Sequence, residues 1–365
     1  MTKAAELAKM GEVLTNSQIG GRRNIVINGA MNVAQRGTSF TSVAGSAYHL
    51  DRYRTGMGDT SARFTVTQAT AGLNGFGNSL KYDCTTAESS LSNADARLFV
   101  TQRIEGQNLQ QLKKGTSDAE KFTVSFYVKS TKTGTYILNI VDIDNNRQIS
   151  QAYTISSSGT WEQKILTFGG DTTGALGNDN GNSFELHWWL IAGTSYSGGS
   201  LATSWQGYAG ASDYEDSAVG NVNLGDSTSN TWEITGIQLE VGSQATPFEH
   251  RSFGEELALC QRYFHKQGGT SYYNIATVTN FTSGAQLGTV RHPVEMRSAP
   301  SVTKSGNWAV LGGDTTVNQT AVSSDSNGQA SEIGFSGGSG GTSGRSSVLR
   351  FSNDANAYLH WDAEL

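Results

Sequence analysis

The sequence predicts a mainly β protein built around an antiparallel jelly-roll sandwich. The 365 residues include 44 glycines and only 3 prolines, with many serine, threonine and asparagine residues. This composition is typical of a chain with many turns. Apolar or alternating segments recur at regular spacing between residues 62 and 241. No helical periodicity intervenes between these segments, which argues against an α/β enzyme.

Residues 1–23 are predicted to form a short helical arm. Leu7, Met10 and Leu14 follow Ala4 at spacings of three and four, which gives a narrow apolar stripe on a helix. An isolated helix of this length is marginal in water. Two interpretations therefore stay open. The segment is either an anchoring arm that docks on another protein or trimerises, or a frayed terminus.

Residues 24–251 are predicted to form the jelly-roll sandwich. The apolar run 25–27 and the turn signal Asn28-Gly29 indicate a short strand pair at its start. Further strands are predicted at residues 62–68, 79–84, 97–105, 121–130, 135–143, 161–168, 184–193 and 232–241. The last of these strands closes the sandwich.

A linking helix is predicted at residues 252–267. Leu257, Cys260 and Phe264 recur at helical spacing, and Glu255-Glu256 lie in the first turn, where the helix dipole favours negative charge. We expect the apolar face to pack on the distal β region or on symmetry mates near a threefold axis.

Residues 268–365 are predicted to form a small distal β domain, the tip. Its strands are expected at residues 272–278, 285–295, 301–306, 347–352 and 357–365. The Gly/Ser tract 334–347 between two of them is expected to be a long loop rather than a linker. The region is either a second, smaller sandwich or a set of strands completed by neighbouring chains.

Several classes of partner are excluded by composition. The net charge is −6 and no run of basic residues occurs, so no nucleic-acid partner is expected. The N-terminus lacks the apolar core of a secretory signal. No segment approaches the ~18 apolar residues of a membrane span, so no membrane insertion is expected. Cys84 and Cys260 are predicted to be free and buried.

No cofactor, metal site or catalytic residue is predicted. The six histidines fall singly, without the spacing of zinc ligands. Hydrolysis of a polysaccharide would need paired carboxylates in a groove. Asp142 and Asp144 are better explained as a strand-end turn, or at most as a weak oxygen site for a structural cation such as calcium. Glu255 and Glu256 are explained by the helix start. The remaining acidic cluster is a polar loop with an aromatic residue in it, and contact with a ligand stays its alternative role: Asp213, Glu215 and Asp216.

Aromatic residues are the candidates for binding a sugar, because a flat ring packs on the apolar face of a pyranose while neighbouring polar groups bind its hydroxyls. Trp188 and Trp189 are adjacent on a strand and must point to opposite faces. Trp205, Tyr208 and Tyr214 lie in the long connection 193–225, where they have no obvious core position. The alternative is that these rings pack the loop onto its own sandwich.

The order and wording of several segments resemble virion fibre and tail proteins of bacteriophages. The segments, over roughly residues 20–300, are NIVINGAMNVAQRGTSF, YHLDRY, VTQRIEG, FTVSFYVKS, WEITGIQLEVGSQATPFEHRSFGEELALCQRYF and VRHPVEMRSAP. The segment MTKAAELAKMGEVLTNSQIGGRRN also resembles the N-terminus of such proteins. The distal 60 residues or so match no wording of the family.

This resemblance implies a carbohydrate-binding-module-like (galactose-binding-like) jelly roll followed by a helix and a small distal β region. It further implies a structural, non-enzymatic virion protein that is made in the host cytoplasm and assembles as a homotrimer. The N-terminal arm would bind other virion proteins of the tail or capsid, and the chain would attach the particle to host surface polysaccharide. The alternative is a capsid-bound head fibre or decoration protein with a mainly structural role.

Overall fold

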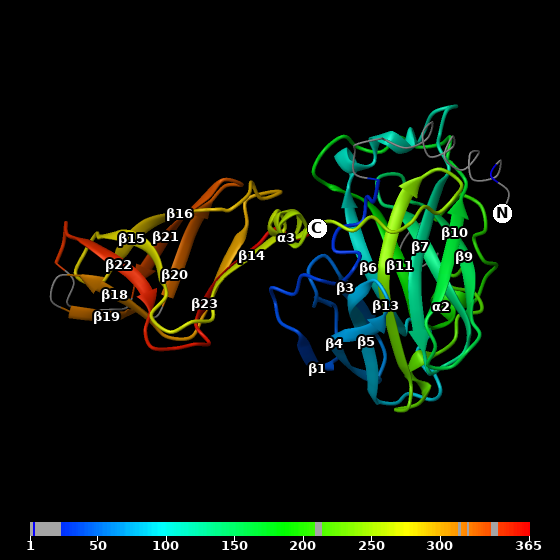
Figure 1. Cartoon of the computed structure of the whole chain (residues 1–365), viewed down its shortest axis with the longest axis horizontal. Coiled ribbons are helices and arrows are strands. Elements are labelled where there is room, and N and C mark those ends of the chain that lie inside the picture. Colours follow the sequence, from blue (N-terminus) through cyan, green and yellow to red (C-terminus); the bar gives the residue numbers. More distant parts are fainter. Residues whose placement is uncertain (1–2, 4–22, 209–213, 313–314, 320, 337–341) are drawn as a thin grey trace. The chain divides into compact units, whose positions relative to one another are not determined.

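The computed structural model describes Lys3 and residues 23–208, 214–312, 315–319, 321–336 and 342–365 (Figure 1). The predicted anchoring residues Leu7, Met10 and Leu14 lie outside the described residues, so the N-terminal arm stays a prediction. The chain divides into two compact units, unit 1 (Met1–Glu256 with Leu365) and unit 2 (Leu257–Glu364). The division falls inside the predicted linking helix rather than at either of its ends.

Unit 1 is an antiparallel β-sandwich of the jelly-roll type. One sheet has six strands in the order β1 (Ser39–Val43), β4 (Arg63–Leu73), β5 (Phe76–Thr86), β13 (Thr231–Val241), β7 (Phe122–Ser130) and β10 (Glu162–Phe168). The other sheet has seven, in the order β12 (Gln206–Gly207), β9 (Arg147–Ile155), β8 (Gly134–Asp142), β11 (Asn182–Ala192), β6 (Arg97–Glu105), β3 (Arg54–Gly58) and β2 (Ala47–Tyr48). The inner faces of both sheets share one hydrophobic core, which confirms the predicted fold class.

Short helical turns occur in the connections of unit 1. They are η1 (Gly106–Asn108), η2 (Gln110–Leu112), α2 (Thr194–Ser197) and η3 (Leu224–Asp226). The last two belong to the long connection between β11 and β13, which also contains the two-residue strand β12.

The segment around Asn28-Gly29 does not form the predicted strand pair. Asn24 instead binds β13 directly, since its Nδ2 donates to Ile237 O at 3.0 Å and its Oδ1 accepts from Leu239 N at 3.1 Å. A Cβ at Gly29 would lie 2.1 Å from the same carbonyl oxygen of Ile237. Val26 is buried beside β13, whereas Ile25 and Ile27 are half-buried. Glycine is required at position 29 because its backbone and that of β13 approach closely.

The linking helix is shorter than predicted. Helix α3 spans Phe253–Gln261. Ser252 and Glu255 form a reciprocal cap, because Glu255 Oε2 accepts from Ser252 N at 3.0 Å and Ser252 Oγ accepts from Glu255 N at 3.3 Å. Phe264, predicted on the helix, is instead the first residue of β14 (Phe264–Gly268).

Unit 2 has two antiparallel sheets and its own hydrophobic core. The smaller sheet orders β14, β23 (Tyr358–Asp362) and β17 (Ser301–Ser305). The larger orders β19 (Thr315–Gln319), β18 (Trp308–Gly312), β22 (Ser346–Phe351), β15 (Asn274–Asn280), β16 (Gln286–Arg291), β21 (Ala330–Ser336) and β20 (Ala321–Ser326).

The predicted pivot residues lie in unit 2. Cys260 is fully buried, Leu257 is half-buried, and Phe264 pairs with Asp362 while its ring contacts that of His360. The burial of Phe264 is thus explained by the small sheet of unit 2 itself. Cys84 and Cys260 are not joined in a disulfide, and both are buried, as predicted.

Candidate functional site

Consecutive side chains of β11 point alternately into the core of unit 1 and to the outer face of the seven-stranded sheet. Trp188 points into the core, where its ring meets Phe126 edge-to-face at 6.0 Å, and it has no exposed surface. Trp189 points to the opposite face, as predicted for adjacent strand residues. Because Trp188 lies wholly in the core, its predicted role as a sugar contact is wrong.

Six rings form a continuous aromatic row on this outer face. In order they are Phe99, His187, Trp189, Tyr196, Tyr214 and Tyr208. Phe99 stacks on His187 at 4.2 Å and lies 4.9 Å from Trp189, measured between ring centroids. Tyr196 follows Trp189 at 5.0 Å. The row therefore begins on β6, crosses β11 and continues into the connection after it.

Two tyrosines complete the row. Tyr214 lies 6.4 Å from Tyr196 and 4.6 Å from Tyr208. Burial raises the pKa of Tyr208, and its hydrogen bond and proximity to Tyr214 raise it further. The structure thus brings together three of the five predicted ring candidates, Trp189, Tyr208 and Tyr214.

The row has a buried base and an accessible edge. Trp189 and Tyr208 are buried, and Trp189 packs against Ile137 and Ala218 under the connection. Phe99, Tyr196 and Tyr214 are half-buried. Only these three rings of the row keep enough exposed surface to pack against a ligand. The predicted role of Trp189 and Tyr208 as sugar contacts is therefore wrong as well.

Gly56 on β3 makes room for the first ring of the row. A Cβ at this position would lie 2.3 Å from the ring of Phe99. At the next ring along the edge, Arg97 Nη1 donates to the hydroxyl of Tyr196 at 3.2 Å and pairs with Asp59 at 2.8 Å. Both of these half-buried rings are therefore held in place by their neighbours.

A charged network lies beside the row. Glu185 pairs with His187 Nε2 at 2.6 Å and with Arg103 Nε at 2.9 Å, and it accepts from Asn182 Nδ2 at 2.7 Å. Burial acts to raise the pKa of Glu185, but the hydrogen bond to His187 and the charges of His187 and Arg103 lower it from 4.5 to about 2. This carboxylate fixes the imidazole on which Phe99 stacks.

Glu185 is expected to make the stability of unit 1 depend on acid pH. Its pKa is lower in the folded chain, so its contribution is fully present above pH 4.5 and is lost as the pH falls towards 2. The shift corresponds to about 3 kcal/mol. Urea unfolding of Glu185→Gln should show the largest loss of stability, relative to the unsubstituted chain, at neutral pH and a smaller one at pH 3. An equal difference at both values would contradict this assignment.

Hydrogen bonds hold the connection 193–225 on the sheet. Ser150 Oγ donates to Ser217 O at 2.8 Å, and Ser217 Oγ donates to Gln148 Oε1 at 2.7 Å. Asp216 accepts from Ser200 N and Gln206 Nε2, both at 2.7 Å. Asp216 therefore supports the loop. Its predicted neighbour Glu215 is exposed, and Asp213 lies outside the described residues.

Trp205 lies apart from the row. Its Nε1 donates to Gly169 O at 2.7 Å, and Lys114 Nζ lies 5.2 Å above its ring. Lys114 itself binds Asp142 Oδ2 at 2.5 Å and Asp171 Oδ2 at 2.9 Å. Trp205 thus covers a buried ion network, which agrees with the packing alternative given for the loop aromatics.

The other acidic candidates have structural partners. Asp142 accepts from Asn145 N at 3.1 Å, as in the predicted turn, and Asp144 accepts from Gly177 N at 2.9 Å. Glu256 accepts from Asn28 N at 2.6 Å. Within the described residues no group of three or more histidine, cysteine or acidic side chains is placed to hold a metal ion. No helix in that part of the chain is long and apolar enough to cross a membrane.

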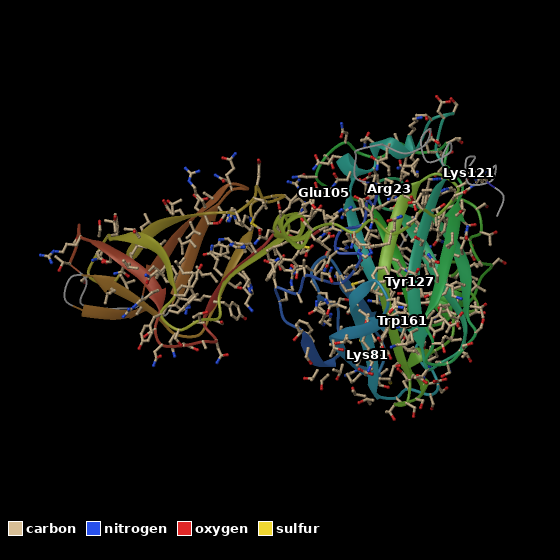
Figure 2. All side chains as sticks on the ribbon, in the orientation of Figure 1. Arg23, Lys81, Glu105, Lys121, Tyr127 and Trp161 are labelled. Atoms are coloured by element: carbon tan, nitrogen blue, oxygen red, sulfur yellow. The ribbon has the colours of Figure 1, made fainter. Side chains whose placement is uncertain are left out.

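The six-stranded sheet carries a separate aromatic surface. Figure 2 labels Tyr127, Trp161 and Lys81 there. Trp161 is occupied on two sides, since its Nε1 donates to Ala71 O at 2.8 Å and Lys129 Nζ lies 4.8 Å above its ring. This surface provides a matched comparison for the aromatic row.

Three members of the row, Phe99, His187 and Tyr196, were not among the predicted site residues. Phe99 carries a signal in the sequence, because it lies between the apolar residues Leu98 and Val100 of a strand and so must point away from the core. Tyr196 lies in the same connection as the chosen tyrosines. His187 gives no signal of its own, since its role depends on stacking across strands.

No protein-family model matches the chain, and no curated protein matches its sequence. Among solved structures the chain is similar to the enzymatically active domain of tailspike protein 4 of bacteriophage CBA120, at 13% identity and a TM-score of 0.29. That match covers 60% of this chain but only 21% of the tailspike chain.

Two carbohydrate-binding modules are similar at the same level. The family 11 module of the Clostridium thermocellum cellulase Lic26A-Cel5E shows 11% identity over 56% of this chain and 100% of the module, with a TM-score of 0.29. TmCBM61, solved with β-1,4-galactotriose, shows 10% identity over 60% of this chain and 100% of that chain, with a TM-score of 0.31. Scores this low carry no weight for function.

Proposed function

We propose that unit 1 binds a glycan on the edge of the aromatic row. The observation that carries this proposal is that three half-buried rings, Phe99, Tyr196 and Tyr214, belong to one row of ring contacts that runs from β6 across β11 into the connection after it. Such rings pack on the apolar faces of successive pyranose units. Arg97 and the pair of Arg103 with Glu185 supply charged and polar groups beside them. No step of bond cleavage is assigned to these groups.

Substitution of the accessible rings tests this function. Each of Phe99→Ala, Tyr196→Ala and Tyr214→Ala should weaken binding about two- to tenfold, if a ring contributes about 0.5–1.5 kcal/mol. Arrays of bacterial surface polysaccharides identify a ligand, and titration calorimetry measures the affinity of each variant. Melting curves show which variants remain folded.

Tyr127→Ala is the matched control, because Tyr127 is also half-buried but lies on the six-stranded sheet. Its affinity should equal that of the unsubstituted chain. If Tyr127→Ala loses binding while the row variants keep it, the glycan site belongs to the other face and the assignment fails.

At the level of the particle, the proposal is a non-enzymatic virion protein, a tail fibre or appendage that acts as a homotrimer and attaches the phage to bacterial surface polysaccharide. It is supported by the resemblance of the quoted segments to phage fibre proteins. Detection of a monomer by mass photometry at micromolar concentration would count against the proposed trimer. Deletion of residues 1–23 tests the anchor. If the truncated chain is still incorporated into particles at the normal level, the arm is not what binds the chain to the tail or capsid.

A further inference from the structure

Two arginines flank Phe99 on the outer face of the seven-stranded sheet. Phe99 pairs with Gly56 of β3, and residues 54 and 58 lie on the same face of that strand, two positions to either side. A Cβ at Gly58 would lie 2.8 Å from Arg97 Nη2, so the guanidinium of Arg97 covers that position. The other position is Arg54, which is half-buried. At about 3.3 Å per residue, each position lies roughly 7 Å from Gly56 along the strand. A ligand packed on Phe99 therefore has an arginine to each side.

Arg54 differs from its neighbours in having no partner. Its guanidinium forms no hydrogen bond or ion pair within the described residues. In contrast, Arg97 pairs with Asp59 at 2.8 Å. Arg103, the next arginine on β6, pairs with Glu185 at 2.9 Å. Of the three arginines, Arg54 alone keeps its donors available for a ligand.

The acceptors near Arg54 are engaged by other donors. Leu365 O accepts at 2.9 Å from the hydroxyl of Tyr48, the cross-strand partner of Arg54. The same oxygen accepts from Arg103. The carboxylate of Glu185 is bound by three side chains, as described above. One positive charge therefore stays uncompensated beside the aromatic row.

The surroundings of Arg54 disfavour its charge. Burial lowers the pKa of Arg54, and the positive charge of Arg103 lowers it further. Tyr48 and Glu185 act in the opposite direction, but the net shift is downward. A cation whose pKa is lowered by folding opposes folding rather than supporting it. Residues kept at a cost in stability are typical of functional sites.

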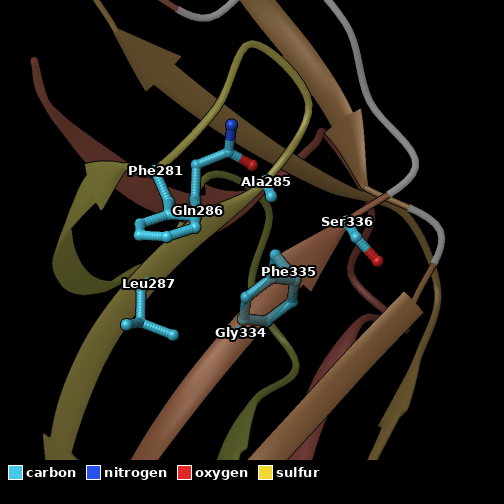
Figure 3. Close-up of a pocket in the computed structure, with 7 residues that line it drawn as sticks. All are labelled: Phe281, Ala285, Gln286, Leu287, Gly334, Phe335 and Ser336. Carbon is cyan, nitrogen blue, oxygen red and sulfur yellow. The ribbon is translucent and has the colours of Figure 1, made fainter. Parts of the chain in front are cut away.

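Unit 2 offers a matched aromatic ring in an uncharged setting. The turn between β15 and β16 borders a hollow of about 240 Å³ (Figure 3). Phe281 stands at its rim and is 73% exposed. None of the seven residues that line the hollow carries a charge. Phe281 is therefore a control for an exposed ring without a cation in its lining.

We propose that the glycan bound by the aromatic row is acidic, and that Arg54 binds the carboxylate of a uronic acid whose ring packs on Phe99. The apolar face of the pyranose lies on the aromatic ring, which leaves the carboxylate at the edge of the sugar. The planar fork of a guanidinium matches the two oxygens of a carboxylate. A single unpaired cation suits this group, whereas a phosphate monoester carries about 1.5 to 2 negative charges at pH 7. This inference rests on the proposed function and deepens it by naming the class of sugar.

Titration calorimetry with the full-length chain tests this class of ligand. The probes are alginate, polygalacturonate, hyaluronate and heparosan, each compared with the same polymer after reduction of its carboxyl groups to alcohols. At least one acidic polymer should bind about tenfold more tightly than its reduced form, as expected for a hydrogen bond to a charged group. The difference should shrink as the salt concentration rises.

Arg54→Gln should remove most of this preference and leave the affinity for the reduced polymer unchanged. Arg54→Lys keeps the charge without the planar fork, so it should retain part of the preference. Two controls should bind as the parent chain does: Phe281→Ala in unit 2, and Lys81→Gln, which removes a half-buried cation from the six-stranded sheet. The melting temperature of Arg54→Gln should stay the same or rise, because an unpartnered cation is removed. A lower melting temperature would assign Arg54 a structural role and overturn the inference.

Phe99→Ala separates this inference from the proposed function. It should weaken the binding of both forms of the polymer. If it does so while Arg54→Gln keeps the full preference for the acidic form, the row remains the glycan site and the role of Arg54 is overturned. The inference also fails if the parent chain binds none of the acidic polymers, or binds each no better than its reduced form. Binding that survives unchanged in Phe99→Ala, Tyr196→Ala and Tyr214→Ala would overturn the proposed function and this inference with it.

Discussion

Replacing Lys114 with methionine is expected to lower the free energy of unfolding of unit 1 by about 3–5 kcal/mol, the usual effect of breaking a buried ion pair. The side chain of Lys114 is 3% exposed, and its ammonium group binds Asp142, Asp171 and the carbonyl oxygens of Thr173 and Gly174. Methionine keeps most of the volume but removes the charge. Two carboxylates would then stay buried with Arg147 as the remaining cation on Asp171.

The adjacent lysine provides a matched control. Lys113 pairs with Glu120 at 2.8 Å, but its side chain is 53% exposed. Water screens such a pair, so Lys113→Met should leave the stability nearly unchanged. Urea unfolding, with hydrogen exchange of unit 1 amides to localise the effect, distinguishes the two variants. Equal losses at both lysines would show that the network contributes no more than a surface pair.

The sequence predicts those strands of unit 1 whose inner face is strongly apolar. β7, for example, buries Phe122, Val124 and Phe126 at alternate positions, which is sufficient to predict a strand. β9 escaped prediction because its intervening residues are polar and many of them are buried under the connection 193–225, as Gln148 and Ser150 are. Their burial depends on a segment distant in sequence. No pattern in the local sequence indicates that the connection buries these polar residues.

The apolar run 25–27 shows the opposite error: a strand is predicted there, and none forms. Its composition is that of a strand, yet it is not one: Ile25 N donates to the backbone of β13, at Leu239 O (2.9 Å), whereas Ile27 N donates to Gln102 Oε1 and Gln102 Nε2 donates back to Ile27 O, both at 2.8 Å. Propensity identifies a segment that will be buried. Only the tertiary structure decides whether another strand or a glutamine pairs with it.

The candidate site was predictable in part. Alternation places Trp188 and Trp189 on opposite faces, but it cannot tell which outer rings remain accessible. Trp189 is covered by the connection, whereas Phe99 packs its ring against Gly56 and stays half-buried. The isolated rings of the sequence become a row only through the pairing of β6 with β11. That pairing joins segments about 80 to 95 residues apart, as in Trp189 opposite Phe99.

Arg251→Met is expected to destabilise unit 1 by about 3 kcal/mol, through loss of a buried cation and its hydrogen bonds. The side chain of Arg251 is 5% exposed. Its guanidinium donates to Asn24 O and, at 3.0 Å, to Val26 O, and it lies 3.3 Å from Glu256 Oε1. These bonds join segments about 225 residues apart in the chain.

Glu249 acts beside Arg251 on the same segment of the chain. Glu249 accepts from the backbone N–H groups of Arg23 and Asn24, both at 2.7 Å, so a single turn before α3 holds the start of the described chain by charge and by hydrogen bonds. Arg251→Lys keeps the charge but not the paired donors, and should lose less stability than Arg251→Met. Hydrogen exchange should rise in residues 24–33 before the rest of unit 1. Unchanged protection of these amides in Arg251→Met would show that the turn does not fasten the segment.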